Sequence, residues 1–162
     1  MKKTLILATL CVLFTSVANA RNIAVPADDP AAIVAVPDAW KFEEIDFGYS
    51  AVSPDKDIFF SVESATKNKI DAMMKNNKAW MKENKIDGSV KPIEKEMTFG
   101  GLPGTVYRFD TKDSDGPTRV DFILLPAGKN RVIFLTLWAS DKEREKHSSE
   151  IDSIMNSVKA IQ

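Results

Sequence analysis

Two consecutive segments near the C-terminal end constrain the fold of this chain more than any other feature. In residues 119–125 and 131–138 the side chains on both alternating faces are largely apolar. A strand with one face in water alternates apolar and polar residues, whereas a strand covered on both faces is apolar throughout. We therefore expect both segments to be central strands of a sheet that is covered on each side.

Further segments complete the predicted sheet. Residues 58–63 alternate, with Ile58, Phe60 and Val62 on one face, which is typical of a strand. Short turns that carry glycine follow several of the later segments, at 100–104, 113–116 and 127–130, and turns of this length favour antiparallel hairpins. The other predicted strands are residues 40–47, 49–52, 91–99 and 105–111.

Two helices are predicted. The first begins at Ser64 or Thr66 and runs to about residue 84, and the second begins at Ser140. There, Ser140 and Glu143 have the spacing of a capping box, and an apolar stripe at helical spacing follows up to Ile161. Together these patterns predict an α+β domain with an antiparallel sheet of about six or seven strands flanked by helices, an α/β/α sandwich.

The N-terminal residues predict export. A short basic start, an apolar run and Ala18-Asn19-Ala20 form the pattern of a signal peptide over residues 1–20, with cleavage after Ala20. We expect a bacterial protein that is periplasmic or secreted and is not inserted in a membrane. Residues 21–36, rich in proline and alanine, are predicted to be an extended leader, and residues 37–162 to be a single domain.

The charge and the cysteine content exclude several function classes. The chain has 22 basic and 23 acidic residues, a formal net charge of −1, so it lacks the basic surface that nucleic acid requires. Its one cysteine, Cys11, lies within the predicted signal peptide. A mature chain without cysteine forms no disulfide and carries out no thiol chemistry.

Few residues are candidates for catalysis or metal binding. His147 is the only histidine, so a multi-histidine metal site is impossible and a serine–histidine–carboxylate triad would have to be built around it. We interpret His147 as a surface residue of the last helix. We therefore predict no catalytic residue, no metal site and no cofactor.

Several acidic residues offer other carboxylate chemistry. The segment 113–116 is similar to part of a calcium loop, but Thr111 and Phe122 would stand at its first and last ligand positions. A hairpin turn explains the same residues, and the pairs Glu43–Glu44 and Glu94–Glu96 fit a solvated face. The acidic residues around Gly116 are Asp110, Asp113, Asp115 and Asp121.

The segment 99–104 is either a structural kink between strands or a loop that contacts a ligand or partner. The candidate contact residues are Tyr49, Phe99, Gly100, Gly101 and Pro103. Aromatic residues and methionines also exceed what one small core requires, so some of them are candidates for lining a pocket.

Several motifs resemble the PsbP-like superfamily, over about residues 36–162. They are Val36-Pro37-Asp38-Ala39-Trp40, the segment from Tyr49 to Pro54, and Phe99-Gly100-Gly101-Leu102-Pro103-Gly104. That superfamily includes an extrinsic photosystem subunit, a Ran-binding import factor and many exported bacterial domains of unknown function. The resemblance implies an antiparallel sheet between helices and a non-enzymatic role, usually contact with another protein.

Three functions follow as hypotheses. The first is an exported, periplasmic accessory or protein-interaction module without catalysis, whose protein partner is unidentified. The second is a carrier or sensor of a small apolar ligand held between the sheet and a helix. The third is a hydrolase that uses carboxylates, for which scattered Asp and Glu residues are the only support.

Overall fold

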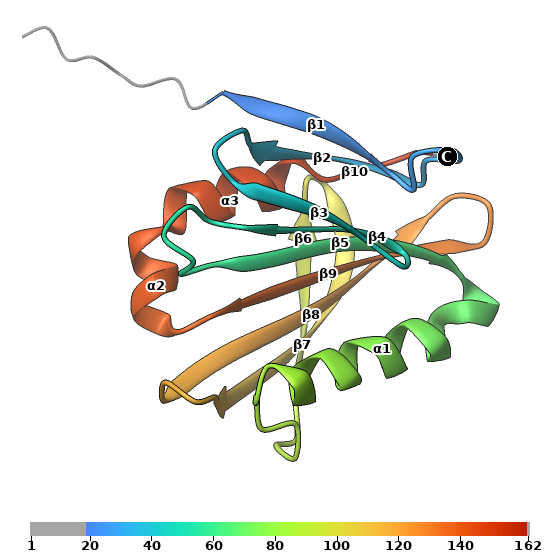
Figure 1. Ribbon diagram of the computed structural model, residues 1–162. Coiled ribbons are helices and arrows are strands. Elements are labelled where there is room, and N and C mark those ends of the chain that lie inside the picture. Colours follow the sequence, from blue (N-terminus) through green and yellow to red (C-terminus); the bar gives the residue numbers. More distant parts are fainter. Residues whose placement is uncertain (1–18, 162) are drawn as a thin grey trace, which may run out of the picture.

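The computed structural model describes residues 19–161, and its main sheet has seven strands in the order β3-β4-β5-β9-β8-β7-β6 (Figure 1). Every neighbouring pair is antiparallel. This confirms the predicted antiparallel sheet of six or seven strands. The strands are β3 (Lys41–Ile45), β4 (Gly48–Val52), β5 (Phe59–Thr66), β6 (Ile93–Phe99), β7 (Leu102–Lys112), β8 (Pro117–Ala127) and β9 (Arg131–Ala139).

The strands β8 and β9 are covered on both faces, as their sequences predict. Ile123 and Ile133 belong to the hydrophobic cluster on one face of the sheet, and Phe122 and Phe134 belong to the cluster on the other. Both strands are inner strands of the sheet. Burial on two faces explains why polar residues are rare in them.

One face of the sheet is covered by α1 (Ile70–Glu83), which follows the short 3₁₀ helix η1 (Lys67–Lys69) (Figure 1). Met73 and Met81 are buried in the cluster beneath this helix. The predicted helix is therefore present, although it begins later than expected because β5 continues to Thr66.

The opposite face is covered by a second sheet together with α3 (Ser148–Ser157). This sheet has the order β1-β2-β10, formed by β1 (Ala20–Val25), β2 (Ala32–Pro37) and β10 (Lys159–Ala160). The expected sandwich is thus built with a helix on one side, and with a helix and three short strands on the other.

The interpretation of residues 21–36 as a leader outside the domain is wrong. Val25, Val34 and Val36 are fully buried in the core. Pro26 and Pro30 lie in the connection between β1 and β2, where proline is compatible with a turn. The prolines therefore mark a loop between two core strands, and the folded domain begins before residue 37.

The last predicted helix is divided into α2 (Asp141–Lys146) and α3, with His147 between them. The capping box is confirmed, because Ser140 Oγ accepts a hydrogen bond from the Glu143 amide and Glu143 accepts one from the Ser140 amide. The predicted helical stripe ends early, since Val158 is buried outside the helix and β10 follows it.

Arg144 fixes α2 to the main sheet. Its guanidinium lies 2.8 Å from the Asp121 carboxylate, which is buried, and it also donates to the backbone oxygens of Arg119, Leu137 and Ala139. Burial lowers the pKa of Arg144, and the charge of Asp121 opposes that change. These contacts set where the segment that follows α2 meets the sheet.

Residues 1–18 lie outside the described part of the structure, and most of the predicted signal peptide falls there. Across residues 19–161, no helix combines the length and the apolar character that crossing a bilayer requires.

Candidate functional site

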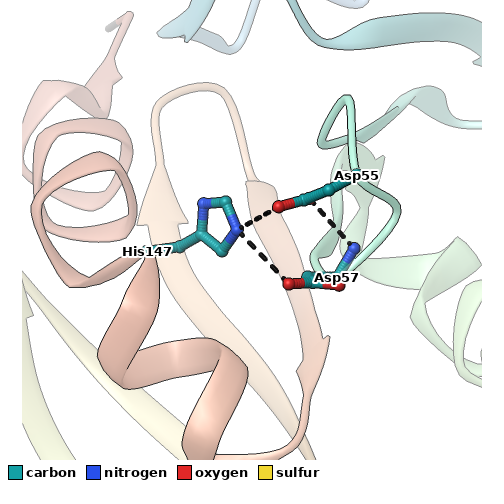
Figure 2. Close-up of side chains that lie close together, drawn as sticks. All are labelled: Asp55, Asp57 and His147. Carbon is teal, nitrogen blue, oxygen red and sulfur yellow. Dashed lines mark hydrogen bonds and ion pairs between the residues drawn. The ribbon is translucent and has the colours of Figure 1, made fainter.

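His147 is buried, with 9% of its surface exposed, so its interpretation as a surface residue is wrong. Figure 2 shows its ring pointing at the loop between β4 and β5. The Nε2 atom lies 2.9 Å from Asp55 Oδ2 and 3.7 Å from Asp57 Oδ2. The Nδ1 atom lies 2.6 Å from Glu150 Oε2. Both ring nitrogens therefore face carboxylates.

This arrangement favours a protonated imidazole. Burial by itself lowers the pKa of His147, but the hydrogen bonds to Glu150 and Asp55 outweigh burial and raise it above its ordinary value. A carboxylate on each ring nitrogen stabilises the cation, in which both nitrogens donate.

Lys146 supplies a second cation to the same cluster. Its ammonium lies 2.7 Å from Asp55 Oδ2 and 2.6 Å from Asp57 Oδ2, and these bonds raise the pKa of Lys146 and lower that of Asp55. Asp55, Asp57 and His147 are close enough together to hold a metal ion, but the ammonium already occupies the carboxylate oxygens. We interpret the group as an ionic clasp between two elements.

A catalytic triad is not assembled around His147. The Ser53 hydroxyl donates to Asp55 Oδ1 at 2.7 Å, and among residues 19–161 no serine hydroxyl is hydrogen-bonded to the imidazole.

The acidic residues near Gly116 are used separately. Asp113 accepts from the amides of Asp115 and Gly116, which confirms the predicted hairpin turn. Asp110 pairs with Arg119 at 2.8 Å, while Asp121 is the buried partner of Arg144. The four carboxylates therefore do not converge on one point.

The segment 99–104 contains a two-residue hairpin turn, Gly100–Gly101, between β6 and β7. Phe99 is buried in the core. Gly100 and Gly101 have φ of +55° and +87°, and a Cβ atom on Gly100 would lie 2.1 Å from the Val158 carbonyl oxygen. Only glycine fits that close approach. Close packing against Val158 therefore explains the glycine at position 100 of this turn. Pro103, next to the turn, is exposed.

Tyr49 lies apart from that turn. It is in β4, stacked on Phe42 with ring centroids 5.3 Å apart, and β5, β9 and β8 stand between β4 and β7 in the strand order. The structure thus does not gather the five candidate contact residues into one site, and their role in binding stays a prediction.

An open groove lies elsewhere, between α1 and the strands β3, β4 and β5, and measures about 610 Å³. We call it the acidic groove. Its lining includes the aromatic rings of Phe59 and Trp80, whose centroids are 4.6 Å apart, and the amides of Asn76 and Asn77. Its carboxylates are those of Glu43, Glu44, Asp46, Glu63 and Glu83.

Glu63 is the most buried of these carboxylates, with 4% of its surface exposed. Its Oε2 atom accepts a hydrogen bond of 2.9 Å from Asn77 Nδ2, and Asn77 Oδ1 accepts one from Thr136. Burial raises the pKa of Glu63 to about 7, and the nearby charge of Asp46 acts in the same direction, whereas the Asn77 bond opposes it. Glu63 therefore exchanges its proton near neutral pH.

The acidic groove is short of positive charge. Glu43 pairs with Lys41 at 2.6 Å, and Asp46 accepts a hydrogen bond from Asn76. Within residues 19–161, Glu44, Asp46, Glu63 and Glu83 form no ion pair. Such a site attracts cations, because uncompensated carboxylates in a cleft concentrate negative potential.

The sequence interpretation missed this groove. Glu63 lies on the strand face opposite Ile58, Phe60 and Val62, and its burial is not predicted from the sequence. Glu43 and Glu44 are exposed, in agreement with the predicted solvated face. A signal was present, because β5 pairs with the doubly covered strand β9, and a glutamate next to such a strand is buried. Asn77 gives a second signal, as a polar residue four positions from the buried Met73 and Met81.

Comparisons with known proteins give matches at the level of structure. No known protein-family model matches the sequence, and no curated protein matches it. The solution structure of cyanobacterial PsbP (CyanoP) from Synechocystis sp. PCC 6803 is similar, with a TM-score of 0.58 and 10% identity over 91% of this chain and 96% of that one.

Two crystal structures are also similar. LpqN of Mycobacterium tuberculosis, described as involved in cell envelope biogenesis, has a TM-score of 0.51 and 15% identity, over 88% of this chain and 92% of LpqN. A protein of Bacteroides thetaiotaomicron VPI-5482 has a TM-score of 0.54 and 11% identity, over 81% of this chain and 45% of that one. Because identities this low establish the fold alone, the conclusion is structural: this chain has a PsbP-like fold.

Proposed function

We propose that the protein is an exported accessory module that acts by binding a partner or ligand without catalysis, and that the acidic groove is its binding site. The observation that carries the proposal is the groove itself. Its volume of about 610 Å³ lies within the range of ligand sites, roughly 300–1,000 Å³. The signal-peptide pattern of residues 1–20 supports export.

The composition of the groove argues against the apolar-ligand hypothesis. Filling the groove with an apolar molecule would remove water from carboxylates such as Asp46 and Glu83 without replacing its hydrogen bonds. That desolvation is unfavourable. A polar or charged occupant fits the same space better.

The buried carboxyl group of Glu63 is the feature that favours an enzyme. A buried carboxyl group with a pKa of about 7 is suited to general acid–base work. Its hydrogen bonds lead to Asn77 and Thr136, which are inward-facing structural partners rather than a nucleophile. Binding accounts for the same group, since a buried carboxylate also serves as a counter-ion.

Native mass spectrometry tests the binding proposal. The protein would be purified gently from the compartment to which it is exported, as wild type and as Ala79→Trp, which places an indole in the groove. The matched control is Ala72→Trp, an exposed position on the same helix that does not line the groove. We expect a non-covalently bound species on the wild type and the control, and its loss from Ala79→Trp.

Two results would contradict the proposal. A bare wild-type protein would remove the evidence for a natural occupant, and equal loading of all three proteins would place the binding site outside the groove. Turnover of ester, glycoside or phosphoester substrates that disappears in Glu63→Gln would instead establish the hydrolase.

A further inference from the structure

Glu63 gives the acidic groove a buried negative group that lacks a charged partner. Its side chain is nine-tenths buried or more, and it lines the groove. The Oε2 atom accepts from Asn77, whereas Oε1 accepts no hydrogen bond from residues 19–161. Burial disfavours the charged form of this carboxyl group, and a cation at Oε1 would stabilise that form.

The other charged groups around Glu63 have the same sign. Glu43 faces the groove from β3, Asp46 from the turn after β3, and Glu83 from α1. Glu44 lines the rim of the groove from the same edge strand, although its side chain lies on the opposite face of the sheet, with Tyr49. Lys41, bonded to Glu43, is the one cation paired with a lining carboxylate in the described chain. The groove therefore selects a ligand by positive charge.

The geometry also discriminates between kinds of cation. A guanidinium binds best to two carboxylate oxygens at once, whereas an ammonium is a point donor. At Glu63, Oε2 already accepts a hydrogen bond from Asn77, so a two-pronged donor would have to share that oxygen, whereas a point donor can use Oε1 alone. The stacked rings of Phe59 and Trp80 offer an apolar wall for methylene groups and a π face for a cation.

We propose that the acidic groove binds an alkylammonium group, with the Glu63 carboxylate as its counter-ion. The inference rests on the proposed function and specifies its ligand chemistry. The ammonium comes either from a free aliphatic amine or from a lysine side chain of a partner protein. Both sources present the same group to Glu63.

Amide-resolved NMR titration of the protein at pH 8 tests the inference. The probes are 1,5-diaminopentane, the peptide Gly-Gly-Lys-Gly-Gly and the neutral analogue 1,5-pentanediol. We expect saturable shifts at groove residues for the two amines and none for the diol. Glu63→Gln should weaken amine binding about tenfold, because a buried charge pair is lost. Glu94→Gln, at an exposed glutamate of β6, should bind as the wild type does.

The pH dependence separates Glu63 from the exposed carboxylates. At pH 5.5 a carboxyl group whose pKa is about 7 is protonated, whereas ordinary Asp and Glu side chains stay charged. Amine binding by the wild type should therefore weaken at pH 5.5, and binding by Glu63→Gln should change little. Tighter binding of the peptide would identify a protein as the source, and tighter binding of the diamine a small molecule.

Three results would overturn the inference: shifts from the diol equal to those from the diamine, unchanged affinity in Glu63→Gln, or no shift from either amine. The native mass spectrometry distinguishes the two failures. A natural species displaced by Ala79→Trp, together with no response to amines, contradicts the ammonium and retains the groove. A bare wild-type protein that also fails to bind any probe contradicts both.

Discussion

Glu63 lies in β5 directly opposite Gly48 on one side and Phe134 on the other, so little water reaches its carboxyl group. The same residue type on β6, at Glu94 and Glu96, is exposed and keeps ordinary solvation. At the scale of single residues, the chemistry of a carboxyl group is thus set by its neighbours in the sheet and not by its identity.

Replacing Glu63 with Gln should make the protein more stable at pH 8. The folded-state pKa of about 7 lies above the ordinary value of 4.5, so wild-type stability falls as pH rises from about 4.5 to 7 and then stays low. The variant avoids this cost, which is about 3 kcal/mol at 1.36 kcal/mol per pKa unit.

Urea unfolding of both proteins at pH 4 and pH 8 measures the effect. We expect nearly equal free energies of unfolding at pH 4, where both side chains are neutral, and a higher value for Glu63→Gln at pH 8. Equal values at pH 8 would mean that Glu63 already has a compensating partner.

At the scale of elements, the interruption between α2 and α3 positions His147 and Lys146 in the ionic clasp. His147 stands between the two helices, with one ring nitrogen on Asp55 from the β4–β5 loop and the other on Glu150 of α3. Lys146 bonds to the same loop. The break therefore places two cations against a loop that lies about ninety residues earlier in the chain.

Substituting His147 with Gln should remove a pH-dependent part of the stability. The folded-state pKa of His147 is raised above 6.5, so its contribution is complete below about pH 6.5 and is lost as pH rises through the folded-state value. We expect the variant to be less stable by about 2 kcal/mol at pH 5.5, from the loss of bonds to a charged group.

The measurement is the difference in unfolding free energy between wild type and variant across pH 5 to 9. The difference should shrink with rising pH, and the control Lys142→Gln, an exposed position in α2, should show no such trend. A difference that is constant with pH would show that folding leaves the pKa of His147 unchanged.

At the scale of the whole molecule, the seven-stranded sheet needs a cover on each face, and the N-terminal strands belong to that cover. The pairing of β2 with both β1 and β10 joins the two ends of the described chain in one small sheet. Ser157 in α3 also donates to the carbonyl oxygen of Ala35 in β2 and accepts from its amide. The N-terminal strand β2 is therefore anchored by two C-terminal elements, α3 and β10.

A chain that begins at Asp38 should fail to fold cooperatively, whereas one that begins at Arg21 should fold. Burial of each large aliphatic side chain contributes roughly 1.5–3 kcal/mol, and the shorter chain lacks Ile23, Val25, Val34 and Val36, all buried. That loss is comparable to the whole stability of a domain, about 5–15 kcal/mol. Thermal unfolding followed by circular dichroism checks it, and a sharp native-like transition in the shorter chain would contradict it.

The sequence by itself determined the α+β class, the antiparallel strands β3 to β9, α1 and the capped start of α2. These depend on local periodicity and turn chemistry, which a single segment carries in full. Residues 119–125 and 131–138 also predicted that both faces of the sheet are covered, because a strand that is apolar on both faces has no side suited to water.

The tertiary structure alone decided the role of β1 and β2, the burial of His147 and the existence of the acidic groove. Each depends on segments far apart in the chain, such as Asp55 with His147 or Glu63 with Asn77. Burial and the partners of a charged group set its pKa, and neither is encoded in local spacing. Glu63 and Glu94 therefore look alike in the sequence, and only the packing of α1 over β5 distinguishes them.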